Sequence, residues 1–350
     1  MHPLKTSRRF IRNIAHVARG IPAVVLANIL LTRRCTQRCR QCTIPQNTGD
    51  NHTLPMNDYR WLVDMLDRHG SHFVSLSGGE PILHPEFDEC IRYVAKKDFV
   101  HVQLLSTLYA GMETVERAVD ALVETGAGIQ ISFDGFGEVA DRIRGAKNVS
   151  DTVLRGVHLL TKKNKSRKHS VRMSANIVIS GPNLHQVPDI VRLFEDLGWR
   201  LNVDLYRWSS GNQREVDEMK VDYTPELRRV LDIVRSSPAV TTPRPIIDRF
   251  PDYLAHRTPK RCPYLATRGF GTKIYINPDM SVSVCLGEPF GNLKEQTIGD
   301  LFSSDEWRSR LKLLHACRGC WNSCYTPSGI AFHPTTLEDL KAIWNMYRQG

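Results

Sequence analysis

The sequence predicts an α/β fold, a parallel sheet with crossover helices, followed by a smaller C-terminal part. Apolar β-rich runs alternate with helical patterns six times along the first part of the chain, and the alternation stops after about Arg207. Parallel neighbours need long connections, which helices supply. At 350 residues the chain also exceeds the usual size of one domain, so a second unit is expected.

The predicted strands are short apolar runs bounded by turn residues. They are Ala23–Thr32, Phe73–Ser77, Val100–Thr107, Gly128–Asp134, Val171–Ser180 and Leu201–Arg207. The segments between them carry apolar residues at three-to-four spacing, which is typical of amphipathic helices. These helices are expected at Asn57–His69, Glu86–Lys97, Glu113–Glu124, Val149–Thr161 and Leu184–Leu197.

The last third of the chain has a different pattern. A helix near Pro225–Arg235 and a proline-rich link precede a hairpin of Lys273–Asn277 and Ser281–Cys285, and a helix is expected at Asp305–His315. The sequence therefore predicts four parts, which are an N-terminal helical extension (1–22), a β/α core (23–225), a linker (226–260) and a C-terminal domain (261–350).

Charge and cysteine content narrow the class of protein. The net charge of +10 permits an acidic partner. Basic and aromatic residues do not cluster as they do in nucleic-acid-binding proteins, so we expect no nucleic acid to bind. The chain has no long apolar run and no signal peptide, so we expect a cytoplasmic protein. In such a chain nine grouped cysteines more often serve metal or redox chemistry than disulfides.

Three cysteines follow the first predicted strand within one short segment, Cys35-Thr-Gln-Arg-Cys39-Arg-Gln-Cys42. Iron–sulfur clusters normally take four cysteines, so a loop with three leaves one iron open to a ligand from outside the protein. A chelating amine and carboxylate on that iron would place a cofactor's sulfonium beside the cluster, where one electron can break a carbon–sulfur bond. The alternatives are a zinc site completed by His52 and three incidental thiols.

Other polar residues also follow the strands of the core. Gly78-Gly79-Glu80 comes after the second strand, Ser106-Thr107 ends the third and Asp134 ends the fourth. The loops after parallel strands converge at one edge, so these groups are expected to share a mouth with the cysteines. Glycines let the backbone approach a ligand closely, and a carboxylate suits an ammonium partner.

The cysteine triplet, the Gly78-Gly79-Glu80-Pro81 turn and the six β/α units resemble the radical S-adenosylmethionine (SAM) superfamily over roughly Leu26–Trp208. The resemblance implies a partial (β/α)6 TIM-like barrel. It also implies that Cys35, Cys39 and Cys42 bind a [4Fe–4S] cluster whose fourth iron is chelated by SAM. Gly78, Gly79 and Glu80 would receive the SAM amino group, and cleavage of SAM would give a 5′-deoxyadenosyl radical that abstracts hydrogen.

Further candidates for the SAM or substrate site come from three elements. Ser132 and Asp134 resemble family positions that contact SAM or the substrate, although Asp134 could also simply form a turn with the glycine that follows it. Arg144 is a candidate because a guanidinium can fork onto a carboxylate, and Asn176 lies on the fifth strand. The family often has an aromatic residue before the third cysteine, whereas this chain has Gln41, which puts the packing of the adenine in doubt.

A second group of cysteines stands in the C-terminal part, at Cys262, Cys285, Cys317, Cys320 and Cys324. With the hairpin and its following helix, this group resembles the SPASM/twitch extension of radical SAM enzymes over about Arg261–Tyr325. The full extension has more cysteines, so the resemblance implies one auxiliary [4Fe–4S] cluster. Cys262, Cys285 and Cys324 would bind it with either Cys317 or Cys320, and a zinc ribbon is the alternative.

These features favour a radical SAM oxidoreductase that tailors a natural-product small molecule, such as a sugar or aminocyclitol, by dehydrogenation, epimerisation or bond formation. A ribosomally made peptide and a lipid precursor are alternative substrates. A non-enzymatic iron–sulfur electron-transfer protein is a different class of function. A reducing partner such as flavodoxin or ferredoxin is expected to supply the electron.

The N-terminal run Arg8–Arg19 has apolar residues on one helical face and arginines around it. Such a helix is expected to cap an open side of the barrel. Contact with an anionic membrane is the alternative, because basic amphipathic helices lie on such surfaces.

Overall fold

The computed structural model describes residues 3–44, 51–165, 170–206, 214–260, 262–266, 272–285, 287–317 and 319–323, with isolated positions at 326, 330, 337, 339–341 and 344. In this part of the chain nine strands form one sheet in the order β6-β5-β4-β3-β2-β1-β7-β8-β9. The strands are β1 (Val24–Thr32), β2 (Phe73–Gly78), β3 (His101–Ser106), β4 (Gly128–Ser132), β5 (Met173–Ile179), β6 (Arg200–Leu205), β7 (Thr272–Ile276), β8 (Ser281–Ser283) and β9 (Gly291–Asn292).

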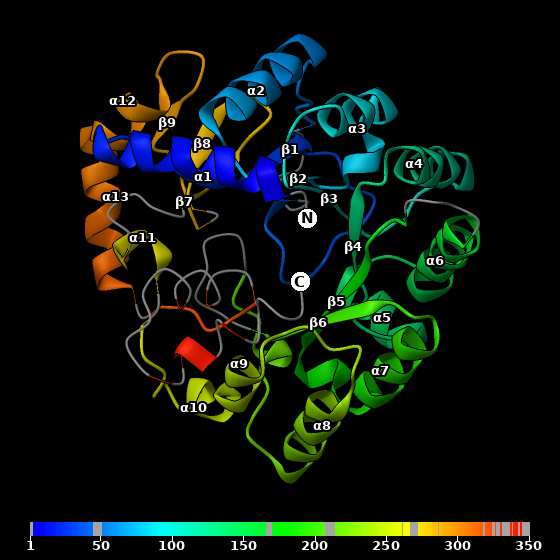
Figure 1. Cartoon of the computed structure of the whole chain (residues 1–350). Coiled ribbons are helices and arrows are strands. Elements are labelled where there is room, and N and C mark those ends of the chain that lie inside the picture. The colour runs from blue at the N-terminus through cyan, green and yellow to red at the C-terminus, as the bar shows by residue number, and fades with distance from the viewer. Residues whose placement is uncertain are drawn as a thin grey trace.

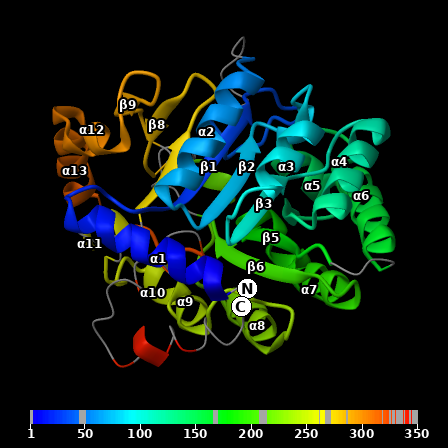
Figure 2. The ribbon, with the colours of Figure 1, turned by 45° about the horizontal axis from the view of Figure 1, so that its top comes forward.

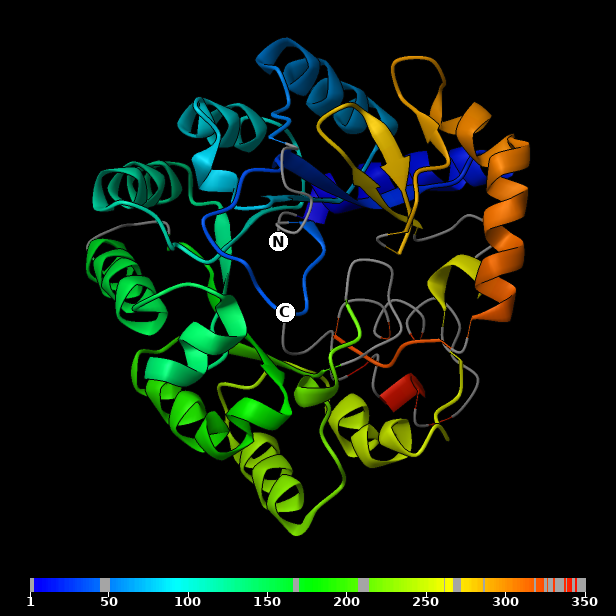
Figure 3. The same cartoon turned by 180° about the vertical axis from the view of Figure 1, so that it is seen from behind.

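The helices that connect the first six strands lie in an arc outside the sheet, and the strands run inside it (Figures 1 and 3). These helices are α2 (Met56–His69), α3 (Phe87–Ala95), α4 (Met112–Thr125), α5 (Gly137–Arg144), α6 (Val149–Asn164) and α7 (Val187–Asp196). Neighbouring strands from β1 to β6 pair in parallel. The predicted α/β fold with a partial TIM-like barrel is confirmed.

Each helix covers the sheet with one apolar face. In α2 the buried residues Tyr59, Leu62, Val63 and Leu66 recur at three-to-four spacing, which places them on a single stripe. Cys90 of α3 is fully buried and belongs to this core. The helices therefore follow from the periodicity that the sequence shows.

The opposite face of the sheet carries polar side chains. Ser77 donates a hydrogen bond to Asn28 across β2 and β1, with 2.7 Å between Oγ and Oδ1. Asn202 of β6 donates to Gln130 of β4, with 2.9 Å between Nδ2 and Oε1. A sheet with one apolar and one polar face is typical of a barrel whose inside is open to a ligand, so this polar face leads to the site.

The C-terminal part extends the same sheet. The predicted hairpin is present, because β7 and β8 pair antiparallel, but β7 also pairs in parallel with β1, with Asn28 opposite Tyr275. This pairing was not predicted, since contacts between residues so far apart leave no local pattern. Further helices in the described ranges are α8 (Pro225–Ser236), α9 (Arg244–Asp248), α10 (Phe250–Leu254), α11 (Pro263–Ala266), α12 (Ile298–Ser303) and α13 (Asp305–Ala316). Short 3-10 turns lie at Pro81–Leu83, Gly181–Gln186 and Asp217–Met219.

The N-terminal helix α1 (Pro3–Ala18) lies across the end of the sheet near β1, β2 and β3 (Figure 2). Arg9 donates to the backbone carbonyls of Ser71 and Asp98, which precede β2 and β3, at 2.6 and 2.9 Å. The helix thus caps the amino ends of the strands, the end opposite to the cysteine loop. None of the described helices is both long enough and apolar enough to cross a bilayer.

Candidate active site

The loop that carries Cys35, Cys39 and Cys42 leaves the carboxyl end of β1 and is held on two sides. On one side the N–H groups of Gly79 and Glu80 donate to the carbonyls of Thr32 and Arg34, both at 2.8 Å. On the other side the N–H groups of Arg38 and Arg40 donate to the carbonyls of Arg144 and Ile143, both at 3.0 Å. The Gly-Gly-Glu turn and the C-terminus of α5 therefore fix the loop by its backbone.

The glycines of the turn pack closely against the backbone of the cysteine loop. A Cβ atom on Gly79 would lie 2.3 Å from the carbonyl oxygen of Arg34, and one on Gly78 would lie 2.3 Å from that of Thr32. Gly78 also has a φ of +152°. Both positions need glycine because the turn touches the backbone of the cysteine loop, and their contact with the SAM amino group stays a prediction.

The thiols of the loop are close together and shielded from water. Burial raises the pKa of Cys35 to about 12, although a hydrogen bond from the Gln37 backbone opposes the shift. Burial also raises the pKa of Cys42 to about 11, and the nearby Cys39 adds to it. Thiolates are the form that binds metal, so cluster assembly must release these protons.

Glu80 is buried beneath this loop, with 1% of its surface exposed. Its carboxylate accepts hydrogen bonds from the Ser106 hydroxyl at 2.5 Å, the Thr107 hydroxyl at 2.6 Å and the Thr107 N–H at 2.8 Å. Burial raises the pKa of the carboxyl group, and these donors oppose the shift. Ser106 and Thr107, which the sequence placed at the mouth without a role, position the Glu80 side chain.

A buried ion pair stands on the other side of the cysteines. Arg144 lies 2.5 Å from Asp134 between Nη2 and Oδ2, and its Nη1 donates to the Cys39 sulfur at 3.8 Å. Asp134 also accepts from the Val178 N–H at 3.0 Å. Burial lowers the pKa of the Arg144 guanidinium, but Asp134 and Cys39 raise it by more. The net shift of this pKa is therefore upward. Asp134 is therefore more than a turn residue, because it holds Arg144 against a predicted cluster ligand.

Ser132 and Asn176 lie beside this pair. They are opposite each other in the register of β4 and β5, and both are half-buried. In the same register the Asn176 carbonyl accepts from the N–H of Phe133 at 3.0 Å. The structure thus brings Ser132, Asp134, Arg144 and Asn176 to one side of the cysteine loop, with Glu80 held by β3 on the other.

The residues at the mouth fit a bound cluster and SAM. Gln37 Nε2 and Gln41 Oε1 are buried in the cysteine loop without hydrogen-bond partners among the described residues, and buried polar atoms of this kind normally have one. No three His, Cys, Asp or Glu side chains in the described ranges surround the position of a single metal ion. A [4Fe–4S] cluster makes a different demand, because each cysteine binds a different iron.

Two of the late cysteines, Cys262 and Cys317, lie near each other although they belong to separate segments. Lys260 donates to the carbonyls of Leu314 and His315 at the end of α13, which brings Cys262 close to Cys317. The Cys317 thiol in turn contributes to a raised pKa of Cys262, behind burial as the main cause. Cys285 lies near buried Tyr264, and Cys320 packs against the core. Cys324 lies outside the described residues.

The segment after Cys320 is attached to the barrel. Ser323 donates to Asp204 of β6 twice, from its N–H at 2.6 Å and from its hydroxyl at 2.7 Å. Trp321 is buried and donates to the carbonyl of Ile246 at 2.9 Å. This attachment holds the segment that follows Cys320 at the carboxyl end of β6. Neither Asp204 nor Ser323 was singled out from the sequence, and only their contact reveals the link.

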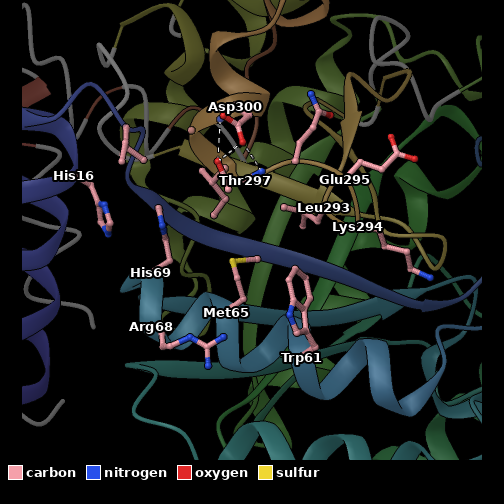
Figure 4. A pocket seen from close by; sticks show the side chains of 14 residues that line it. His16, Trp61, Met65, Arg68, His69, Leu293, Lys294, Glu295, Thr297 and Asp300 are labelled. Carbon is pink, nitrogen blue, oxygen red and sulfur yellow. Dashed lines mark hydrogen bonds between the residues drawn. The ribbon is translucent and has the colours of Figure 1, made fainter.

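A pocket of about 670 Å³ lies apart from this mouth (Figure 4). Its lining residues include His16, Trp61, Met65 and His69, from α1 and α2, and Leu293–Asp300 before and within α12. None of the predicted site residues lines it. The chemistry is therefore assigned to the mouth at the carboxyl ends of the strands, on the evidence of the buried polar groups there.

Comparisons with known proteins show the family and the fold. A model of the radical SAM superfamily matches residues 29–206. PqqA peptide cyclase from Methylorubrum populi is 27% identical over 87% of this chain and 81% of that protein. Fe-coproporphyrin III synthase from Methanosarcina barkeri is 25% identical over 55% of this chain and 46% of that protein. Streptococcus suis SuiB, solved bound to its precursor peptide SuiA, superposes with a TM-score of 0.66 at 15% identity, over 95% of this chain and 79% of that one.

The fold and the mouth define an α/β barrel enzyme with a three-cysteine loop after its first strand. The chain belongs to the radical SAM superfamily. Its cofactors accordingly include a [4Fe–4S] cluster and SAM.

Proposed function

We propose that this enzyme oxidatively modifies a peptide. The observation that carries the proposal is the length of the match to PqqA peptide cyclase. It spans 333 residues, whereas the match to the porphyrin-forming relative spans 194. The family model itself ends at residue 206, whereas the likeness to the peptide enzyme covers 87% of this chain and so extends well into its C-terminal part. The comparisons thus favour the peptide alternative over the sugar or aminocyclitol that the sequence favoured.

Cys35, Cys39 and Cys42 would hold the cluster, which when bound supplies the electron that cleaves SAM and yields the hydrogen-abstracting radical. Glu80 would accept the SAM ammonium group while Ser106 and Thr107 keep its carboxylate in place. Arg144 would act as a cation beside Cys39, and Asp134 would orient it. Ser132 and Asn176 would line the space for the ribose or the substrate.

A second [4Fe–4S] cluster of the SPASM/twitch type would accept the electron that the substrate radical loses. Cys262, Cys285 and Cys324 would bind it with Cys317 or Cys320. The support is the approach of Cys262 to Cys317 and the attachment of Ser323 to the barrel. Removal of one hydrogen atom, one electron and one proton leaves the peptide two hydrogens lighter. A flavodoxin or ferredoxin would supply the electron for SAM cleavage.

The test uses the full chain, reconstituted with iron and sulfide without oxygen and supplied with SAM and dithionite. Short peptides encoded next to the gene are added, and an aminocyclitol and a sugar serve as competing substrates. We expect close to eight irons per chain for two clusters, 5′-deoxyadenosine, and a peptide lighter by two hydrogens. A product from the sugar or aminocyclitol alone contradicts the proposal.

Two sets of variants separate the cluster roles. Cys35→Ala, Cys39→Ala and Cys42→Ala should abolish deoxyadenosine formation. Cys262→Ala and Cys285→Ala should lose about four irons but still cleave SAM, since the first cluster is unchanged. If the second set retains all its iron, the auxiliary cluster is not held by these residues.

A further inference from the structure

Helix α1 binds the rest of the protein through its polar side. Arg9 is buried, forms an ion pair with Asp67 and donates to two backbone carbonyls. Asn13 is fully buried and lies 3.1 Å from His72, between Nδ2 and Nδ1. His16 stacks on His69 with 4.3 Å between ring centroids. These three positions recur at three-to-four spacing, so the inward stripe of the helix is polar.

The outward stripe of the same helix is apolar. Ile11 has 66% of its surface exposed, Phe10 has 50% and Ile14 has 47%. A surface helix of a globular protein normally turns its apolar stripe to the core and its polar stripe to water. In α1 the polar stripe faces the barrel and the apolar stripe faces water. Contiguous exposed apolar surface of this kind marks an interaction site.

The charged residues of the helix itself are all basic. The segment Pro3–Ala18 contains no aspartate or glutamate. Arg8 and Arg19 are exposed. Arg12 donates to the backbone carbonyls of Asp67 and Arg68, and the one buried arginine of the helix, Arg9, is neutralised by Asp67. An apolar stripe flanked by cations fits a surface that offers negative charge above an apolar layer, and an anionic bilayer is such a surface.

We propose that α1 docks the enzyme on an anionic membrane surface, with Ile11 and Ile14 entering the headgroup region and the exposed arginines contacting the lipid phosphates. The polar stripe keeps the helix attached to the barrel while its apolar stripe is in lipid. Because α1 covers the amino ends of the strands, the docked enzyme turns its mouth away from the bilayer. The membrane is then a docking surface, and the substrate enters from the aqueous side.

The test is co-sedimentation of the full-length holoenzyme with vesicles of phosphatidylcholine alone and of phosphatidylcholine mixed with phosphatidylserine. We expect binding to the mixed vesicles that weakens as salt is raised. An Ile11→Ser/Ile14→Ser variant should bind at least tenfold more weakly. Ile233→Ser is the matched control, because Ile233 is 41% exposed on α8, away from this helix.

Deoxyadenosine formation in solution should be equal in all these proteins, since neither stripe residue touches the mouth. Should the double serine variant unfold, Arg8→Glu/Arg19→Glu supplies the same test through charge. Three results would overturn the proposal: no binding of the parent to the mixed vesicles, equal binding by the stripe variants, or a parent dimer that the stripe variants dissociate. The last result would assign the stripe to a second copy of the chain.

Discussion

Each end of the barrel buries an arginine paired with an aspartate, and the further partners of the two arginines differ. At the amino end Arg9 bonds to Asp67 and two backbone carbonyls and lies over the ring of Phe99. At the carboxyl end the Arg144 side chain pairs with Asp134 and donates to the sulfur of Cys39. One arginine joins structural elements, and the other holds its charge against a reactive group.

Burial and pairing with an aspartate therefore do not by themselves identify a functional arginine. Both arginines are less than a tenth exposed and both meet an aspartate. What separates them is whether the remaining donors end on backbone carbonyls or on a group that can bind metal. The two ends should therefore respond differently to matched substitutions.

The largest effect is expected at the turn beneath the cysteine loop. Gly79→Ala would place a methyl group 2.3 Å from the Arg34 carbonyl, so the loop or the turn must move. We expect at least a hundredfold loss of 5′-deoxyadenosine formation, because displacement of about 1 Å in a positioned site has effects of this order. Gly111→Ala is the control, since its methyl group would meet nothing within 4 Å. Equal activity in the two variants would show that the turn does not position the loop.

Substitution of methionine for each arginine tests whether Arg9 and Arg144 have different roles. Arg9→Met should lower the free energy of unfolding by about 3 kcal/mol, the cost of breaking a buried pair, and leave deoxyadenosine per folded chain within about twofold. Arg144→Met should lower deoxyadenosine formation at least tenfold and change the electron paramagnetic resonance spectrum of the reduced cluster. Denaturant titration and the two assays measure this. If Arg9→Met impairs SAM cleavage as strongly as Arg144→Met does, the two ends of the barrel do not have separate roles.

A smaller effect is expected where the C-terminal segment meets the carboxyl end of β6. Ser323→Ala removes the hydroxyl that donates to Asp204 at 2.7 Å. A hydrogen bond to a charged group contributes about 2 kcal/mol, so the unfolding of this segment should become easier by roughly that amount. Fluorescence of the adjacent buried Trp321 during denaturation measures it, with Ser303→Ala on α12 as a surface control. No change in the transition would contradict the attachment.

The smallest expected effect is on the pH dependence of folding stability, through His69 at the amino end of the barrel. Burial, helped by the charge of His16, lowers the pKa of His69 from 6.5 to about 4. As the pH falls below 6.5 the unfolded chain gains this proton first, so stability is full above 6.5 and is lost towards pH 4. Between pH 6.5 and 5.5 the loss from His69 should be about 1 kcal/mol. His69→Gln should flatten the dependence by that amount, and an unchanged slope would contradict it.

The sequence predicted the six barrel strands because each is a local pattern, and it predicted the first cysteine group because its members stand in one loop. It also placed Glu80 and Asp134 at the mouth, since they follow strands or end them, and it named Arg144 only because a guanidinium can fork onto a carboxylate. Helix α5 was missed, because it has eight residues and too few turns to show a clear period. The attachment of this helix to the cysteine loop was missed with it.

The C-terminal part was less predictable for a physical reason. Its cysteines stand on a hairpin, before a short helix and after a long one. Only a tertiary contact, that of Lys260 with the end of α13, brings Cys262 near Cys317. The role of Ser323 could not be inferred, because its partner Asp204 is 119 residues away. The grouping of the late cysteines was visible, but their mutual geometry was not.

The pairing of β1 with β7 has a consequence for how the protein is made. β1 is the first strand of the barrel, yet its second neighbour begins at Thr272. A ribosome that has completed β2 through β6 has therefore left one edge of β1 open, beside the loop that carries the first cysteines. Non-local pairings of this kind form late in folding. The wall behind the cysteine loop is thus finished only after most of the chain has been synthesised, and stable insertion of iron and sulfide is expected to follow translation.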